Sequence, residues 1–389
     1  MTNKSVFIET YGCQMNVYDT ELVKTILKKA NYSFSDNEKN ADVVMLNTCS
    51  VRDNANRKIY NRIHEIRRAR DGKPVQIGVL GCMATNFRKK ILDDKRLKID
   101  FIAGPDSYKH LPSLIDEADQ SGKAFHFSLS EYETYSDILP TRQEGLNAWI
   151  AIMRGCNNYC TFCVVPHTRG RERSRDPHNI VEEVKTLVKH GHKQVTLLGQ
   201  NVNSYLNDKY DFTDLMKMVS DVEGIERIRF TSPHPKDFPR KLLHLMAERD
   251  NICKQIHLPL QAGNDRILEM MNRTYTKQEY LDLVTEIREI MPDVMLTTDI
   301  ILGFPTETWA EYEDTVDVVE KVEYDSAFIF NYSERPNTLA SKRYPDDVSA
   351  EEKKKRIMFI NEIQRSISLR KNEAHVGQTH RILIEQLES

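Results

Sequence analysis

The chain has 389 residues, of which 40% are hydrophobic and 29% are charged, a composition that excludes a disordered protein and is typical of two or three globular domains. The formal net charge of -3 excludes a generally basic surface, so any contact with RNA has to come from local basic patches. The sequence has no apolar signal region at its start and no apolar stretch of membrane-spanning length, and we expect a cytoplasmic protein without membrane contact.

Residues 1–118 alternate apolar runs with helical patterns. The apolar runs cover residues 5–12, 41–49, 75–83 and 100–106. This alternation predicts a parallel sheet covered by helices, an α/β sandwich domain. Three of the predicted strands end at Cys13, Cys49 and Cys82. Because ligands gather at the carboxyl ends of the strands in such sheets, we expect the three thiols to lie on one rim.

Residues 119–147 are polar and lose this periodicity, which predicts a linker. A second alternation over 148–375 contains six strand-like runs with helices between them. It predicts a partial (β/α)6 barrel with its active site at the carboxyl ends of the strands. The last part of it, 349–374, is one amphipathic helix that we expect to brace the barrel. Residues 376–389 begin with another strand-like run.

Seven cysteines in a chain without a secretion signal are expected to be metal ligands or buried thiols. Cys156, Cys160 and Cys163 form a C-x3-C-x2-C run directly after the first barrel strand. Three thiolates can hold three corners of a four-iron cluster and leave the fourth iron open to a small molecule. A zinc site would need a fourth ligand, and His167 is near enough in sequence to keep that alternative open.

The run CNNYCTFC, with Phe162 before its last cysteine, resembles the signature of the radical S-adenosylmethionine superfamily. The resemblance implies a [4Fe-4S] cluster whose open iron binds S-adenosylmethionine, which is cleaved to a 5′-deoxyadenosyl radical. It also implies cofactor contacts at later strand ends, namely Gly199, Gln200, Asn201, Gln261, Gly263, Ile301, Gly303 and Phe304. Glycine at such turns often serves backbone geometry, and Gln or Asn often caps a helix, so structural roles stay open for these residues.

The motifs TYGCQMN, LNTCSVRDNA and LGCM around Cys13, Cys49 and Cys82 resemble the amino-terminal domain of the methylthiotransferases. This resemblance implies a second [4Fe-4S] cluster, on which the transferred sulfur is held. The motifs LLGQNVNSY, VPHTRGRERSR, HLPLQAG and DIILGFPTET extend the likeness over nearly the whole chain, and it is strongest to the tRNA-2-methylthio-N6-dimethylallyladenosine synthases. Cys253 matches neither set and is expected to be an inert thiol.

The resemblance implies that one S-adenosylmethionine methylates a sulfur and a second removes hydrogen from C2 of an isopentenylated adenosine next to the tRNA anticodon, on its 3′ side. The implied partners are that tRNA anticodon loop, an electron donor such as flavodoxin or ferredoxin, and an iron–sulfur carrier protein, and we expect a monomer. Arg169, Arg171, Arg173 and Arg175 are candidates to hold RNA phosphates. A second basic set, equally compatible with a solvated surface, comprises Arg52, Arg57, Lys58, Arg62, Arg67 and Arg68.

Two features depart from the family pattern. The family usually ends in a small TRAM-like β-barrel that binds RNA, and residues 376–389 match only its start, so we expect that domain to be cut off. Asn337 stands where the pattern has glycine. Three rival functions stay open: methylthiolation of threonylcarbamoyladenosine in tRNA, methylthiolation of a ribosomal protein side chain, and a zinc-stabilised RNA-binding module without catalysis.

Overall fold

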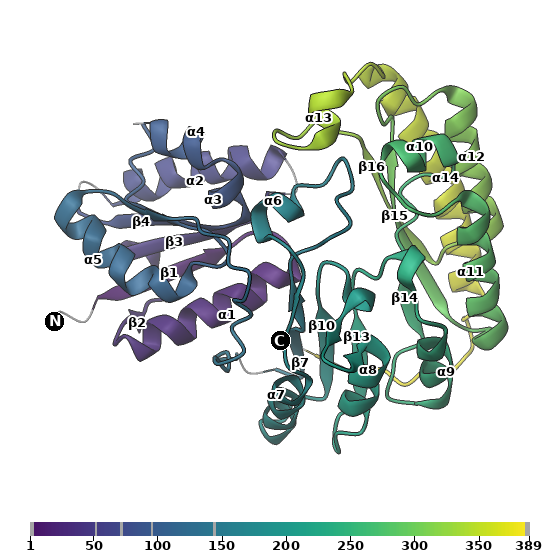
Figure 1. Ribbon diagram of the computed structural model, residues 1–389, viewed down its shortest axis with the longest axis horizontal. Coiled ribbons are helices and arrows are strands. Elements are labelled where there is room, and N and C mark those ends of the chain that lie inside the picture. The colour runs from purple at the N-terminus through teal and green to yellow at the C-terminus, as the bar shows by residue number, and fades with distance from the viewer. Residues whose placement is uncertain (1–3, 51–52, 71–72, 95, 143–144, 386–389) are drawn as a thin grey trace. The chain divides into compact units, whose positions relative to one another are not determined.

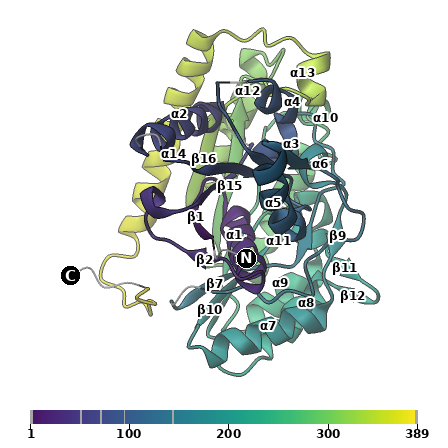
Figure 2. The ribbon, with the colours of Figure 1, turned by 90° about the vertical axis from the view of Figure 1, so that its left-hand side faces the viewer.

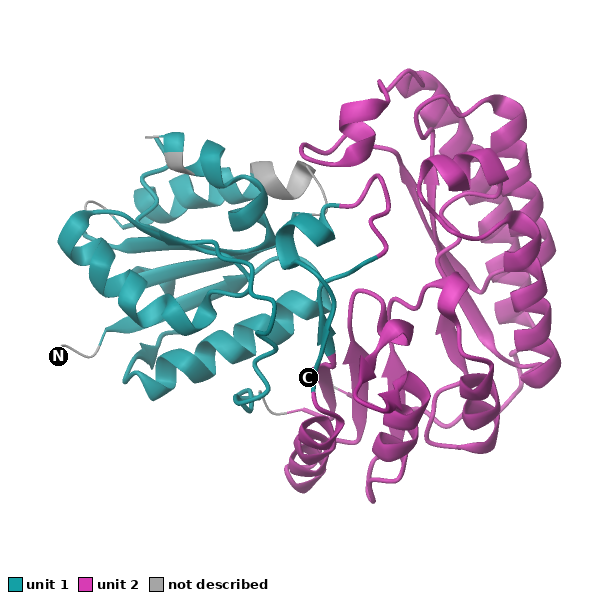
Figure 3. Ribbon diagram, viewed as in Figure 1, with its two compact units in different colours: residues 1–144, 153–157, 164–175 teal, residues 145–152, 158–163, 176–389 magenta. Residues whose placement is uncertain are grey.

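The computed structural model describes residues 4–50, 53–70, 73–94, 96–142 and 145–385. The chain forms two compact units (Figure 3). Unit 1 comprises Met1–Glu144, Met153–Asn157 and Val164–Arg175, and unit 2 comprises Gly145–Ile152, Asn158–Cys163 and Asp176–Ser389. The division therefore falls inside the C-x3-C-x2-C run, with Cys156 in unit 1 and Cys160 and Cys163 in unit 2.

Unit 1 contains a six-stranded sheet in the order β2-β1-β3-β4-β5-β6, in which every neighbouring pair is parallel. Its strands are β1 (Ser5–Thr10), β2 (Ser33–Phe34), β3 (Val43–Thr48), β4 (Gln76–Gly81), β5 (Phe101–Ala103) and β6 (Ala124–His126). Its helices are α1 (Gln14–Lys29), α2 (Asp53–Ala69), α3 (Cys82–Asn86), α4 (Arg88–Asp93), α5 (Leu111–Ser121) and α6 (Val165–Arg169). Helices α1 and α5 lie on one side of the sheet and α2 and α4 on the other (Figure 1). The predicted parallel sheet of the amino-terminal part is thus confirmed. A short antiparallel pair, β8 (Met153–Arg154) and β9 (Arg173–Ser174), completes the unit.

The apolar runs of the sequence form the core of this sheet. All six residues of β3 are buried, as expected for a central parallel strand covered on both faces. Helix α2 presents Ile59, Ile63 and Ile66, at helical spacing, to a core cluster that includes Val44 and Val79. The hydrophobic period of the sequence therefore decides which side of each element is buried.

The sheet of unit 1 extends into the segment predicted as a linker. Helix α5 ends at Ser121, and β6 then pairs in parallel with β5 as the edge strand. Further along, Tyr135 is fully buried, and its hydroxyl donates to the carbonyl oxygen of Pro105 at 3.0 Å. A three-residue strand is too short to give a periodic pattern, which is why the sequence indicated only a polar stretch here.

Unit 2 contains six parallel strands in two three-stranded sheets, β13-β10-β7 and β14-β15-β16. These strands are β7 (Asn147–Ala151), β10 (Gln194–Leu198), β13 (Arg227–Phe230), β14 (Gln255–His257), β15 (Met295–Leu302) and β16 (Ser326–Asn331). A parallel bridge between Ile228 and Ile252 links the chain next to β14 to β13. A small antiparallel pair, β11 (Leu206–Asn207) and β12 (Tyr210–Asp211), follows β10.

Helices separate these strands in chain order, and two more follow the last strand. They are α7 (Pro177–Lys189), α8 (Phe212–Ser220), α9 (Arg240–Glu248), α10 (Asp265–Met270), α11 (Lys277–Ile290), α12 (Trp309–Val322), α13 (Leu339–Arg343) and α14 (Ala350–Glu373). Several begin where the sequence offers a capping box, as in α11 with Thr276 and Glu279 and in α12 with Thr308 and Glu311. The observed architecture is therefore mixed α/β throughout.

The last long helix, α14, packs on β15, β16 and α12 in both views (Figures 1 and 2). Its buried contacts are apolar through Ile360 and Ile367 and ionic through Arg356, which meets Glu307 at 2.6 Å. Beyond α14, residues 379–385 form no strand, although the sequence is strand-like there, because a strand needs a neighbouring strand to pair with. None of the helices that the structure describes is long and apolar enough to cross a membrane.

Candidate metal centres

Cys13, Cys49 and Cys82 lie at the carboxyl ends of adjacent strands of unit 1. Cys13 follows β1 and caps α1, Cys49 follows β3, and Cys82 opens α3 directly after β4. The loop before Cys13 passes very close to Cys49, since a Cβ on Gly12 would lie 2.4 Å from the Cys49 Cβ. The order β1-β3-β4 thus places the ends that carry the three thiols side by side on one rim.

The charges around these thiols favour thiolate at Cys13. A hydrogen bond with Cys49 lowers the pKa of Cys13 to about 6, with burial opposing and the positive charge of Arg169 adding to the effect. Burial raises the pKa of Cys82, and Arg169 counteracts it. Thiolate is the form that ligates metal, so a cation beside the rim suits ligand chemistry.

Arg169 is anchored beside this rim by two residues of α1. Its Nη2 lies 2.9 Å from an Asp19 carboxylate oxygen and 3.3 Å from Asn16 Oδ1. Asp19 also pairs with Arg154 at 2.5 Å, and all three charged side chains are buried. Burial by itself would raise the pKa of Asp19, but the two guanidiniums outweigh it and lower the pKa.

Three of the four arginines predicted to contact RNA are buried inside unit 1. Arg169 joins Asp19, Arg173 meets Asp106 at 2.7 Å, and Arg175 donates to the Tyr18 hydroxyl at 3.1 Å. A guanidinium held in this way is already engaged within the protein, which speaks against the prediction that these three residues hold RNA phosphates. Arg171 alone of the four is exposed.

The second basic set on α2 is also partly engaged within unit 1. Arg62 pairs with Glu9 at 2.8 Å and with Glu38, and Arg67 meets Asp100 at 3.2 Å. Lys58 and Arg68 are exposed. Arg52 and the side chain of Arg57 lie outside the described residues.

The loop that carries Cys160 and Cys163 is fastened within unit 2 by the turn after α10. Thr161 N donates to the Met271 carbonyl at 3.0 Å, and Asn272 donates to the Asn158 carbonyl at 2.9 Å. Arg273 then lies beside the thiol, with its Nη1 3.5 Å from Cys160 Sγ. Arg273 is thus a buried cation beside Cys160, as Arg169 is a buried cation that interacts with Cys13 and Cys82, and no motif of the sequence pointed to it.

Buried polar atoms without partners gather after β10. Asn201 is 1% exposed, and neither its Oδ1 nor its Nδ2 has a hydrogen-bond partner in the described part of the chain. Gln200 Oε1 is likewise buried and without a hydrogen-bond partner in the described part of the chain. Because an orphaned buried polar atom costs about 1–3 kcal/mol, these amides fit the lining of a site that a polar ligand completes.

His234, which the sequence analysis did not single out, belongs to the same region of unit 2. Its backbone exchanges hydrogen bonds with the Asn203 side chain, and its ring lies 5.6 Å from that of Tyr275. Nδ1 accepts from Lys236 N at 3.3 Å, which places the proton on Nε2, a buried donor without a partner among the described residues. Burial and the charge of Arg273 lower its pKa to about 3, so the ring is neutral at pH 7. The sequence feature that could have identified His234 is the motif SPHP, which begins two residues after the end of β13.

Other predicted cofactor contacts are explained by packing. A Cβ on Gly263 would lie 2.5 Å from the Asp314 carbonyl oxygen, and one on Gly303 would lie 2.5 Å from Lys353 Cγ. Phe304 is fully buried against Tyr332. Packing gives these three positions a structural role, and their contact with the cofactor stays a prediction. Of the remaining candidates, Gly199 and Gln261 are buried, whereas Phe162 and Ile301 are half-buried.

Within the described residues, no three His, Cys, Asp or Glu side chains are arranged closely enough to form a metal site as they stand. The donor chemistry nevertheless fits an iron–sulfur cluster, because each thiol set has a buried arginine beside it that can offset thiolate charge. His167, the fourth ligand of the zinc alternative, is exposed on α6.

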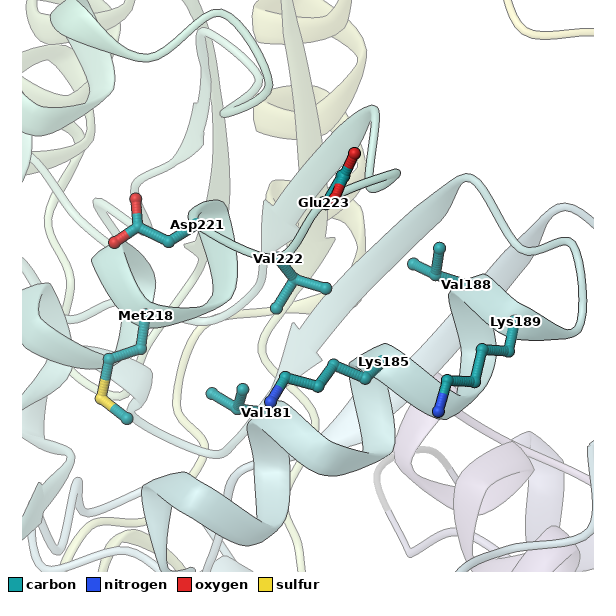
Figure 4. A pocket seen from close by; sticks show the side chains of 8 residues that line it. All are labelled: Val181, Lys185, Val188, Lys189, Met218, Asp221, Val222 and Glu223. Atoms are coloured by element: carbon teal, nitrogen blue, oxygen red, sulfur yellow. The ribbon is translucent and has the colours of Figure 1, made fainter.

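A pocket on the surface of unit 2 lies elsewhere (Figure 4). It is formed by α7, the end of α8 and the residues after it, with Val181, Val188, Met218 and Val222 among its lining. The carboxyl ends of α7 and α8 precede β10 and β13, so this pocket is at the amino ends of those strands. It contains none of the predicted site residues.

Comparison with known proteins decides the family. The model of the radical SAM superfamily matches residues 150–319, and that of the uncharacterized protein family UPF0004 matches residues 5–104. A tRNA-2-methylthio-N(6)-dimethylallyladenosine synthase of Chloroherpeton thalassium is 46% identical over 383 residues, which are 98% of this chain and 85% of that protein. A synthase of the same name from Bacteroides thetaiotaomicron is 45% identical, over 98% of this chain and 86% of that protein. The chain belongs to the family of the tRNA-2-methylthio-N6-dimethylallyladenosine synthases.

Membership of this family confirms the prediction of a methylthiotransferase enzyme that acts on tRNA. It decides against the binding module without catalysis. Membership of the radical SAM superfamily also implies a [4Fe-4S] cluster and S-adenosylmethionine.

Solved structures agree on the fold. The radical S-adenosylmethionine methyltransferase TsrM from Kitasatospora setae has a TM-score of 0.66 at 14% identity, over 87% of this chain and 75% of that chain. The cobalamin-dependent S-adenosylmethionine radical enzyme OxsB has a TM-score of 0.61 at 11% identity, over 93% of this chain and 56% of that chain.

Proposed function

We propose that this chain converts N6-isopentenyladenosine, on the 3′ side of the tRNA anticodon, to its 2-methylthio derivative by radical chemistry. The observation that carries the proposal is a second set of three cysteines at neighbouring strand ends of unit 1, in addition to the C-x3-C-x2-C run. A radical enzyme that needed only one cluster would have no use for a second thiol rim with a buried cation beside it.

Each cysteine set has its own task in this proposal. Cys156, Cys160 and Cys163 would hold the cluster that binds S-adenosylmethionine, and Cys13, Cys49 and Cys82 would hold a second, auxiliary [4Fe-4S] cluster. When bound, these groups supply the methyl group, the transferable sulfur and the means of removing hydrogen from C2 of the adenine.

The protein's own residues position the cofactor. The orphaned amides of Gln200 and Asn201 would hydrogen-bond the polar groups of S-adenosylmethionine, and the neutral Nε2–H of His234 would donate to an acceptor beside them. Further contacts are proposed for Gly199, Phe162, Gln261 and Ile301. The packing roles of Gly263, Gly303 and Phe304 hold the strand ends in place.

We propose a methylthiotransferase domain over 1–118, followed by a connecting segment over 119–147. Residues 148–375 would form a partial (β/α)6 barrel from the six parallel strands of unit 2, braced by α14, and 376–389 would start a TRAM-like domain.

Arg171 remains a proposed phosphate contact. A flavodoxin or ferredoxin and an iron–sulfur carrier are proposed partners of a cytoplasmic monomer.

Nucleoside mass spectrometry of tRNA from a bacterium that lacks its own synthase tests the proposal. Expression of this chain is expected to restore the 2-methylthio derivative of isopentenyladenosine, and the Cys160→Ala variant is the matched control that should not. Appearance of 2-methylthio-threonylcarbamoyladenosine instead would move the assignment to the rival substrate. In parallel, anaerobic reconstitution should load two four-iron clusters per chain, and a single cluster would contradict the proposal.

A further inference from the structure

Arg169 has one guanidinium nitrogen left over after its protein contacts are made. Nη2 is used by Asp19 and Asn16. Nη1 is buried and has no hydrogen-bond partner in the described part of the chain, and the residue as a whole is only 3% exposed. A buried arginine donor without an acceptor is costly, so Nη1 is suited to a further acceptor at the rim, where Cys82 already interacts with the Arg169 guanidinium.

The thiol rim is next to this free donor. Asn16 Oδ1, which accepts from Arg169 at 3.3 Å, also lies 3.7 Å from Cys13 Sγ. Helix α6, which ends at Arg169, packs on α3, whose first residue is Cys82. Cys82 and Cys13 are among the groups that interact most strongly with the Arg169 charge. The acceptor is therefore expected among the groups that the rim holds.

The charges point to an anion. Asp19 carries one negative charge and faces two guanidiniums, those of Arg154 and Arg169, so this buried group of three has an excess of one positive charge. A negatively charged centre held by the thiols beside Arg169 would compensate this positive charge. Asp19 itself is engaged by the two arginines and by the Tyr108 hydroxyl, which donates to its carboxylate at 3.1 Å.

We propose that Arg169 is a positioning residue of the auxiliary centre, and that its guanidinium donates from Nη1 to an anionic sulfur bound at the Cys13, Cys49 and Cys82 rim. The inference rests on the proposed function, since it requires that the rim holds an iron–sulfur centre. Arg169 therefore belongs to the sulfur side of the enzyme and not to its RNA side, where the basic pattern of its sequence had placed it.

The charge of Arg169 would also affect the reduction potential of the auxiliary centre. A one-electron-reduced cluster carries one more negative charge than the oxidised cluster, so a buried cation beside it favours reduction. Loss of the Arg169 charge should shift the reduction potential of the auxiliary centre to a more negative value. Lysine would keep the charge without the forked contact to Asp19 and Asn16.

The test uses the full-length chain with Cys160→Ala, which is expected to load the auxiliary centre alone. Arg169→Gln, Arg169→Lys and the control Arg171→Gln, an exposed arginine two residues after the end of α6, are each added to that background. Iron and sulfide per chain are measured, and the centre is titrated with dithionite and followed by electron paramagnetic resonance.

We expect Arg169→Gln to lower the reduction potential or the iron content, Arg169→Lys to stay near the parent, and Arg171→Gln to match the parent. An Arg169→Gln protein with full iron and the parent potential would overturn the inference. If Arg169→Gln does not fold, Arg169→Lys decides, since failure of this variant to bind iron would overturn a role based on charge. A parent that binds no cluster would instead refute the auxiliary centre, and with it the proposed function.

Discussion

Asp19→Asn is the most direct perturbation of the buried charges in unit 1. The substitution keeps the size of the side chain but removes the carboxylate that pairs with both Arg154 and Arg169, at 2.5 and 2.9 Å. Breaking a buried ion pair by removing one partner typically costs about 3–5 kcal/mol, because the other charge stays buried and uncompensated. Here two guanidiniums are left, so we expect a loss of about 4 kcal/mol in the free energy of unfolding of unit 1.

Urea denaturation measures this loss, with an internal control. Both tryptophans, Trp149 and Trp309, belong to unit 2, so their fluorescence follows unit 2, whereas far-ultraviolet circular dichroism follows both units. A loss of about 4 kcal/mol, divided by an m value of about 2 kcal/mol/M, shifts the unit 1 transition by about 2 M urea. The fluorescence transition should move much less. Asp36→Asn, an exposed aspartate in the same unit, is the matched control and should leave both transitions in place.

The pH dependence gives a second check. The pKa of Asp19 is lowered in the folded state, so its stabilisation is fully present above the unfolded pKa of about 3.9 and is lost as the pH falls through the folded value. The difference between the wild type and Asp19→Asn should therefore be constant near neutral pH and should shrink on acidification below about pH 4. A shift of the unit 1 transition below about 0.5 M, or a difference that persists in acid, would refute the reasoning.

Two further predictions concern the thiol sets. Cys160→Ala should abolish cleavage of S-adenosylmethionine, whereas Cys49→Ala should keep abortive cleavage but lose sulfur transfer. Chromatography of 5′-deoxyadenosine and of modified tRNA measures both effects, with Cys253→Ala as the control. Normal sulfur transfer by the Cys49 variant would contradict the assignment of Cys49 to an auxiliary cluster. Gly12→Ala should reduce iron at the unit 1 rim, because its Cβ would lie 2.4 Å from the Cys49 Cβ at a φ of +122°. Gly122→Ala, with a φ of +78° but nothing within 4 Å of the added Cβ, should keep full iron, and equal iron in both variants would speak against this steric account.

Much of the fold could be predicted because its signals are local. The run from Val43 to Thr48 is apolar enough to be a central strand, and its hydrophobic period fixes which faces of α2 are buried. The strand β6 was missed because three residues are too few to show a hydrophobic period. It forms because residues from Ala124 onward can pair with the free edge of β5.

The sequence alone was enough to predict both groups of cysteines, because their spacing and their positions after strands can be read along the chain. Adjacent parallel strands then bring Cys13, Cys49 and Cys82 to one rim. Whether the arginines of the HTRGRERSR run are buried in ion pairs or exposed was decided only by the tertiary structure. In sequence, Arg169 and Arg173 are part of a basic run, but their counter-charges, Asp19 and Asp106, lie 150 and 67 residues away. Whether a charged side chain is solvated or buried depends on which distant group the fold brings next to it. The spacing of residues within a short motif cannot predict that pairing.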